Sequence, residues 1–192
     1  KADKKEKLID MKLSDFMWET ASESPAPGGG SISAYMGSLG AALGTMVANL
    51  SSHKRGWDDR WEEFSEWAEK GKYYHDKLLE MVDEDTNAFN KIMDAFGLPK
   101  KTAEEKASRK KAIQDATRYA IEVPFETMKL CYESMEVMKA MAEIGNPNSV
   151  TDAAVGALAA SAGVSGAFLN VRINAADFDD KAFTTDIIKE GE

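Results

Sequence analysis

A single acidic residue on the buried side of a long predicted helix is the strongest candidate for chemistry. Apolar residues recur at steps of three and four over residues 58–96, and Asp85 falls on this stripe between Val82 and Phe89. A carboxylate removed from water must be paired, hydrogen-bonded or protonated. Asp85 is therefore either a proton donor with a raised pKa or a structural carboxylate that binds a backbone group or a basic residue. The spacing alone leaves both open.

A glycine-rich loop offers a second kind of site. Gly28, Gly29 and Gly30 follow two prolines, a combination that predicts a loop, and Ser31 can cap the helix that comes next. Free N–H groups at a helix N-terminus bind carboxylate or carbonyl oxygens. A glycine-rich loop by itself is weak evidence for a ligand.

A second turn, residues 145–152, also opens a predicted helix. It carries the amide side chains of Asn146 and Asn148, and Ser149 is positioned as a helix cap. Asp152 follows three residues later. It can bind a ligand, or it can be the acidic half of a capping arrangement at the positive end of the helix dipole.

These candidates are carried by a chain that we predict to be all helical. Two uncharged helices, near 32–50 and 153–171, each carry a stripe of small residues, so they are expected to pack on each other or across a subunit boundary. Thr102 and Glu105 have capping-box spacing and predict a further helix, which Pro124 should kink into two halves.

Composition narrows the class of protein. The chain has 192 residues, 24 basic and 33 acidic, with a net charge of −9, which fits one domain and argues against nucleic-acid binding. One cysteine and two histidines predict no metal site and fit a cytoplasmic location. Residues 24–52 are uncharged but too polar for a typical membrane span, so no membrane is expected.

Residues 1–10 are interpreted as a linker or domain-junction remnant, and residues 11–192 as one helical domain. Within that domain a basic cluster follows the third predicted helix. This cluster is either a solvent-exposed helix face without a binding role or a binding surface for the anionic tail of a substrate. The cluster comprises Lys100, Lys101, Lys106, Arg109, Lys110 and Lys111.

Four segments in this order and spacing closely resemble the formimidoyltetrahydrofolate cyclodeaminase family: residues 25–31, 46–50, 83–89 and 145–152. The resemblance implies an all-helical, dimer-forming enzyme that converts 5-formiminotetrahydrofolate to 5,10-methenyltetrahydrofolate and ammonia. In many members a glutamate formimidoyltransferase precedes this domain, within histidine degradation. Two alternatives remain: a methenyltetrahydrofolate cyclohydrolase of the same family, and a non-catalytic helical oligomerisation module.

The resemblance also assigns roles to residues. The acid of the family's Asp-x-Asp segment matches Asp85, which becomes the general acid for the departing ammonia. Burial against Val82 and Phe89, with Asp83 and Glu84 as like charges, is expected to raise its pKa.

The resemblance implies that the glycine-rich loop and the turn at residues 145–152 bind the folate. The substrate-binding residues are expected to be Gly28, Gly29, Gly30, Ser31, Asn146, Asn148 and Asp152, with Asn49 as a lesser candidate. Lys54 and Arg55 are expected to meet the glutamyl carboxylates, and the basic cluster a longer polyglutamate tail. No cofactor beyond the folate substrate is implied.

Overall fold

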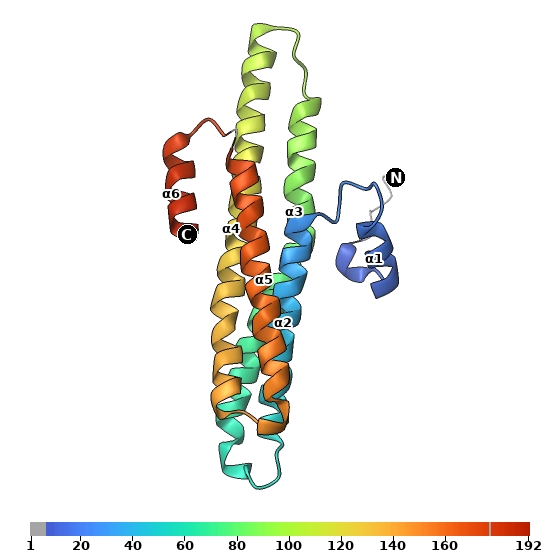
Figure 1. Ribbon diagram of the computed structural model, residues 1–192. Helices are drawn as coiled ribbons and strands as arrows, with labels where there is room; N and C mark the ends of the chain where they lie inside the picture. Colours follow the sequence, from blue (N-terminus) through green and yellow to red (C-terminus); the bar gives the residue numbers. More distant parts are fainter. Residues whose placement is uncertain (1–6, 177) are drawn as a thin grey trace.

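The computed structural model describes residues 7–176 and 178–192, and all regular secondary structure in these ranges is helical (Figure 1). Four long helices form an elongated bundle, and the short helices α1 and α6 lie on either side of it in this view. The expected all-helical fold is confirmed. The bounds are η1 Leu8–Asp10, α1 Leu13–Thr20, α2 Gly29–Ser52, η2 Asp58–Arg60, α3 Trp61–Gly97, α4 Ala103–Ile144, η3 Pro147–Ser149, α5 Val150–Ala175 and α6 Lys181–Gly191.

The two uncharged helices, α2 and α5, pack directly on each other, as their small-residue stripes predict. A Cβ atom added to Gly40 would lie 2.5 Å from the carbonyl oxygen of Gly156, and one on Gly163 would lie 2.9 Å from that of Ser33. These backbones approach so closely because no side chain stands between them. Both helices are longer than predicted, since α2 begins at Gly29 within the loop and α5 continues to Ala175.

Helix α3 buries the predicted stripe only as far as Asp85. Phe64, Leu78 and Val82 are fully enclosed, whereas Phe89 is 38% exposed. Beyond Asp85 the buried face turns toward α4, where Ala88 joins a small cluster with residues of that helix. The cause is the start of α2 beside Asp85. Past that point α3 has no α2 to cover its former buried face, and the predicted burial of Phe89 is wrong.

Helix α4 begins with the predicted capping box between Thr102 and Glu105. It runs from Ala103 to Ile144 with Pro124 inside it, so the proline does not end the helix, and the predicted kink stays a prediction. Proline lacks the N–H that would bond the carbonyl of Ala120, four residues earlier. The side-chain amide of Asn174 on α5 donates to that carbonyl instead, at 2.7 Å. The proline therefore leaves no carbonyl oxygen of Ala120 without a hydrogen bond.

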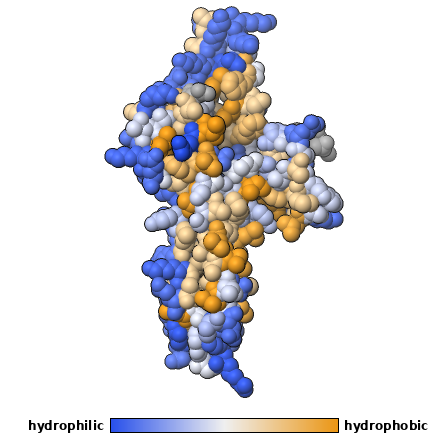
Figure 2. Space-filling view, viewed as in Figure 1, coloured by the Kyte–Doolittle hydropathy of each residue, from blue (hydrophilic) through white to orange (hydrophobic). Residues whose placement is uncertain are grey.

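Two helical segments are long and apolar enough to cross a membrane, Gly29–Ser52 and Pro147–Ala175. The first is 56% buried within the bundle, as expected for a core helix, but the second is only 28% buried. Large apolar side chains of α5 such as Leu158 and Leu169 are more than 60% exposed. Figure 2 shows apolar residues gathered along the middle of the face formed by α5 and α2. The expected absence of a membrane and the expected homodimer stay predictions.

Candidate active site

Asp85 lies against the N-terminus of α2 and takes the place of its missing cap. Gly28, the residue before the helix, has no side chain to do this. The backbone N–H of Ser31 donates to Asp85 Oδ2 at 2.9 Å, and Ser31 Oγ lies 3.1 Å from the same oxygen. A carboxylate is favourable here because of the helix dipole. The prediction that Ser31 caps α2 is therefore wrong. Ser31 is the third residue of the helix, and it binds the carboxyl group of Asp85.

The hydroxyl of Ser31 has a second acceptor. Its Oγ lies 2.8 Å from the carbonyl oxygen of Val82, closer than to Asp85. A hydroxyl carries one proton, so it donates to only one of the two at a time. When it donates to Val82, the contact between Ser31 Oγ and Asp85 Oδ2 is a hydrogen bond only if the carboxyl group is protonated, whereas the backbone N–H of Ser31 donates to Oδ2 in either case. Ser31 can therefore accompany both the acid and the carboxylate form of Asp85.

Burial raises the pKa of Asp85, and the hydrogen bonds from the side chain and backbone of Ser31 oppose this shift. The expected repulsion from neighbouring acids is not among its causes. Asp83 instead accepts the backbone N–H of Leu8 at 2.8 Å, and Glu84 pairs with Tyr119. Burial, not like charge, raises the pKa of this carboxyl group and makes it a candidate proton donor.

The glycine loop is shaped by its neighbours rather than by a left-handed backbone. A Cβ atom on Gly30 would overlap the Asp85 carboxyl group, and one on Gly29 would lie 3.2 Å from Asn170 Nδ2. Gly28 has more room, with its nearest contact at 3.9 Å. Gly30 is thus the residue that lets the acid reach the end of α2.

The loop, the acid and α5 enclose a cleft of about 200 Å³. Asn170 and Asn174 line it from α5, one helical turn apart. Each uses its side-chain NH2 on a backbone carbonyl, of Gly166 at 2.9 Å and Ala120 at 2.7 Å. Their amide oxygens are left to accept hydrogen bonds from a ligand. Sequence analysis missed both asparagines, although two amides spaced by four on an otherwise apolar helix were a visible signal.

The other predicted binding residues lie at the opposite end of α2. The backbone N–H of Asn146 donates to Ser51 Oγ at 2.8 Å, which places the second turn there. Ser31 and Ser51 are separated by 20 residues of α2, or about 30 Å at 1.5 Å per residue. The expectation that both loops hold one pterin is therefore not met within a single chain.

Residues at that far end have other contacts. The Lys54 ammonium lies 3.8 Å from the centre of the Trp57 ring, and Asn146 Oδ1 accepts the backbone N–H of Asn148 at 3.2 Å. Ser149 stands at the N-terminus of α5 without a side-chain capping bond, so its predicted capping role is wrong. Asp152 lies in the first turn, where the helix dipole favours it. Asn49 lines a separate groove, along the C-terminal half of α2.

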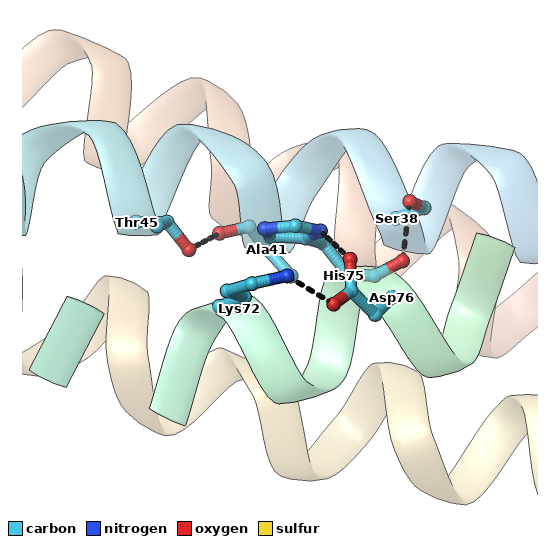
Figure 3. Close-up of polar contacts among 6 residues, drawn as sticks. All are labelled: Ser38, Ala41, Thr45, Lys72, His75 and Asp76. Atoms are coloured by element: carbon cyan, nitrogen blue, oxygen red, sulfur yellow. Dashed lines mark hydrogen bonds and ion pairs between the residues drawn. The ribbon is translucent and has the colours of Figure 1, made fainter. Parts of the chain in front are cut away.

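That groove also contains His75 (Figure 3). Its Nδ1 lies 3.0 Å from Asp76 Oδ1, and Asp76 also pairs with Lys72. Ser38 Oγ donates to the backbone oxygen of His75 at 2.8 Å. His75 therefore lies at the contact of α2 and α3 with its Nδ1 paired and its side chain 25% exposed to the groove. Within residues 7–176 and 178–192, no group of three or more potential ligands could hold a metal ion.

Known proteins resemble this chain in sequence and fold. The model of the formiminotransferase-cyclodeaminase family matches residues 12–192. A methenyltetrahydrofolate cyclohydrolase of Methylorubrum extorquens is 39% identical over 94% of this chain and 86% of its own. Formimidoyltransferase-cyclodeaminases of Gallus gallus and Mus musculus are 37% and 34% identical over 93% and 92% of this chain.

The chain spans about a third of the length of those two bifunctional proteins, 33% and 32%. The crystal structure of formiminotetrahydrofolate cyclodeaminase from Thermotoga maritima aligns with a TM-score of 0.80 and 27% identity, over 94% of this chain and 88% of that one. Sequence and fold agree along nearly the whole chain. It therefore belongs to the formiminotransferase-cyclodeaminase family, and corresponds to its C-terminal cyclodeaminase/cyclohydrolase domain.

Proposed function

We propose that this chain is a cyclodeaminase that converts 5-formiminotetrahydrofolate to 5,10-methenyltetrahydrofolate and ammonia, with Asp85 as the general acid. The observation that carries the proposal is the half-buried carboxyl group of Asp85, held at the end of α2 by Ser31 and open to a cleft. The alternative of a non-catalytic oligomerisation module leaves Asp85 only its role as the cap of α2 and gives the cleft beside it none.

The reaction needs one proton at a defined place. N10 of the folate attacks the formimino carbon carried by N5, and N10 gives up its own proton. The carbon then expels the former imino nitrogen, which leaves as ammonia only after it is protonated. An acid with a pKa near the working pH speeds such a step by about 10² to 10⁴. Asp85 can deliver this proton, and the amide oxygens of Asn170 and Asn174 can accept N–H groups of the bound folate.

A cyclohydrolase reaction is the second candidate, and the Methylorubrum extorquens relative favours it at 39% identity. In that reaction water adds to the methenyl carbon and the ring opens. The attacking water loses a proton, so the same carboxyl group acts as a base by microscopic reversibility. The two reactions share the cleft and differ in the nucleophile.

The active unit is proposed to be a homodimer that pairs through the apolar face of α2 and α5. This face carries Leu39, Met46 and Leu158 in exposed positions, and an uncharged exposed helix face is typical of an interface. An antiparallel pair about the middle of α2 would bring Asn49 and Lys54 of the second copy near the Asp85 cleft. The separation of the two groups of predicted binding residues supports this pairing.

The tail of the folate has two proposed contacts. Lys54 would reach it from the second copy, and the basic cluster at residues 100–111 would reach it from the end of the bundle where α3 ends and α4 begins (Figure 1). Arg109 there donates to the backbone oxygen of Phe96 at 3.1 Å. We further propose that a formimidoyltransferase is fused upstream and that the protein is cytoplasmic. No nucleic acid, membrane or cofactor other than the folate is expected to take part.

The test is to follow ammonia release and methenyltetrahydrofolate absorbance together, with 5-formiminotetrahydrofolate as substrate. Asp85→Asn should retain the fold and lose about 10² to 10⁴ in kcat. Asp94→Asn, on an exposed turn of the same helix, is the matched control. Ring opening of methenyltetrahydrofolate without ammonia release would select the cyclohydrolase, and no binding of any folate would select the oligomerisation module.

The dimer has its own test. In the proposed dimer each site takes Asp85 from one subunit and Lys54 from the other. The Asp85→Asn and Lys54→Ala variants therefore each lose activity through a different subunit of the site. When the two variants are mixed and allowed to exchange subunits, about a quarter of the sites should be intact and activity should return. If each site is contained in one chain, mixing restores nothing.

A further inference from the structure

A second cavity adjoins the Asp85 cleft and has no part in the function proposed above. It measures about 370 Å³ and lies between α3 and the segment that precedes α1. Ala26 and Thr86 line both spaces, so the two are neighbours across a shared wall. The cleft alone is smaller than the roughly 300 to 1,000 Å³ of most small-molecule sites. A folate needs more room than the cleft offers, and this cavity is the adjoining space.

Asp83 gives the cavity its chemistry. Its Oδ1 accepts the backbone N–H of Leu8 at 2.8 Å. Its Oδ2 is buried and has no hydrogen-bond partner among the residues that the structure describes. A buried acceptor without a donor is costly, and such groups in native proteins call for an explanation. The simplest one is a donor that arrives with a ligand.

The other polar side chains of the cavity agree with this. Glu19, Asn87 and Asn90 line it together with Asp83, and Lys7 contributes one ammonium group, so carboxylate and amide oxygens outnumber the cation. A ligand part rich in N–H donors suits such a wall, whereas an anionic group is repelled by two carboxylates.

We propose that this cavity binds the 2-amino-4-oxopyrimidine edge of the folate's pterin ring, with Asp83 as the acceptor of its N–H groups. The inference rests on the proposed function, since it places the pterin so that N5 and N10 lie over the shared wall beside Asp85. The glutamyl tail then leaves at the other end of the cleft, away from Glu19. Two carboxylates two residues apart thus take two roles, Asp83 in binding and Asp85 in proton transfer.

Entry of the ring requires the segment from Lys7 to Met11 to move outward, because Lys7, Leu8 and Met11 line the cavity. Leu8, Ile9 and Met11 are partly buried, and the turn Leu8–Asp10 rests against α3. Its displacement uncovers apolar surface that the bound ring would cover in turn, and the bond from Leu8 to Asp83 is exchanged for bonds from the ligand. Asp83 is therefore a carboxylate held by this segment until the pterin takes its place.

The test compares tetrahydrofolate with its 2-desamino analogue by calorimetry under anaerobic conditions, in the full chain and in Asp83→Asn. Asparagine keeps an oxygen for the Leu8 N–H and replaces the unpartnered acceptor with a donor. The parent should prefer tetrahydrofolate by roughly tenfold or more, and Asp83→Asn should lose most of this preference. Asp94→Asn should keep it, and thermal melts check that each variant is folded.

The outcomes separate this inference from the proposed function. If Asp83→Asn discriminates between the two ligands as the parent does, the pterin does not use Asp83 and the inference is wrong, although the cyclodeaminase proposal stands. Loss of discrimination in Asp83→Asn, in a parent that binds tetrahydrofolate but does not turn over its formimino derivative, supports the inference and removes the proposed reaction. A parent that binds neither ligand overturns both.

Discussion

Gly30→Ala should disable the candidate active site without changing any group that does chemistry. Gly30 is the second residue of α2, and its Cα faces the carboxyl group of Asp85. An added Cβ atom would lie 2.5 Å from the carboxyl carbon and 2.7 Å from Oδ2, where an ordinary contact is at least 3.4 Å. The alanine methyl group and the acid cannot occupy their present positions together.

The size of the effect follows from these distances. Asp85 must retreat by about 1 Å to reach an ordinary carbon contact near 3.5 Å. Its two contacts with Ser31, at 2.9 and 3.1 Å, would then exceed hydrogen-bond length. Overpacking of this kind costs about 1 to 3 kcal/mol, and a misplacement of about 1 Å at a reacting group can cost 10² in rate.

Urea denaturation and the ammonia-release assay measure the two effects separately. Gly97→Ala is the matched control, because a Cβ atom at that helix-terminal glycine meets nothing within 4 Å. It should change neither quantity beyond a few tenths of a kcal/mol. In an Asp85→Ala background the clash disappears, so Gly30→Ala should become neutral or stabilising. An additive destabilisation in that double variant, or near-normal turnover in Gly30→Ala, would refute the reasoning.

Two further predictions concern stability. Asn174→Ala removes the donor of the Ala120 carbonyl and should cost about 1 to 3 kcal/mol in urea denaturation. The cost should shrink in a Pro124→Ala background, because the backbone N–H of residue 124 can then bond the Ala120 carbonyl. Equal costs in both backgrounds would contradict the view that Asn174 replaces this N–H. Burial raises the pKa of Asp85 above 3.8, so its protonated form stabilises the fold at low pH, and this contribution is lost as the pH rises through the folded-state pKa. The difference between the melting temperature of Asp85→Asn and that of the parent should therefore increase as the pH rises above 3.8. If this difference does not change with pH, the pKa of Asp85 is not raised by folding.

Local sequence patterns predicted the helices and the central acid well. The three-and-four spacing that placed Asp85 on a buried stripe depends only on the geometry of one helix. The capping box at Thr102 and Glu105 is likewise a contact between residues three apart. The small-residue stripes of α2 and α5 predicted their mutual packing because a helix without side-chain bulk has few other ways to bury its face.

Capping was predicted less well. Ser31 and Ser149 have the residue type of helix caps, but neither caps its helix. For α2 the cap is Asp85, which comes from another helix 54 residues away. A preference for serine at helix ends is a local rule, and it is overridden when a tertiary contact supplies a stronger acceptor.

The chemistry of this protein is thus divided between two levels. The sequence by itself determined the helical class, the candidate acid and the uncharged helices, because each is encoded in the spacing of neighbouring residues. Only the tertiary structure decided that Asn170 and Asn174 line the cleft, that Asp83 faces a separate cavity, and that residues 146–152 lie at the far end of α2. Those relations depend on how separate helices pack and in which direction each one runs, which no periodicity along a single segment encodes.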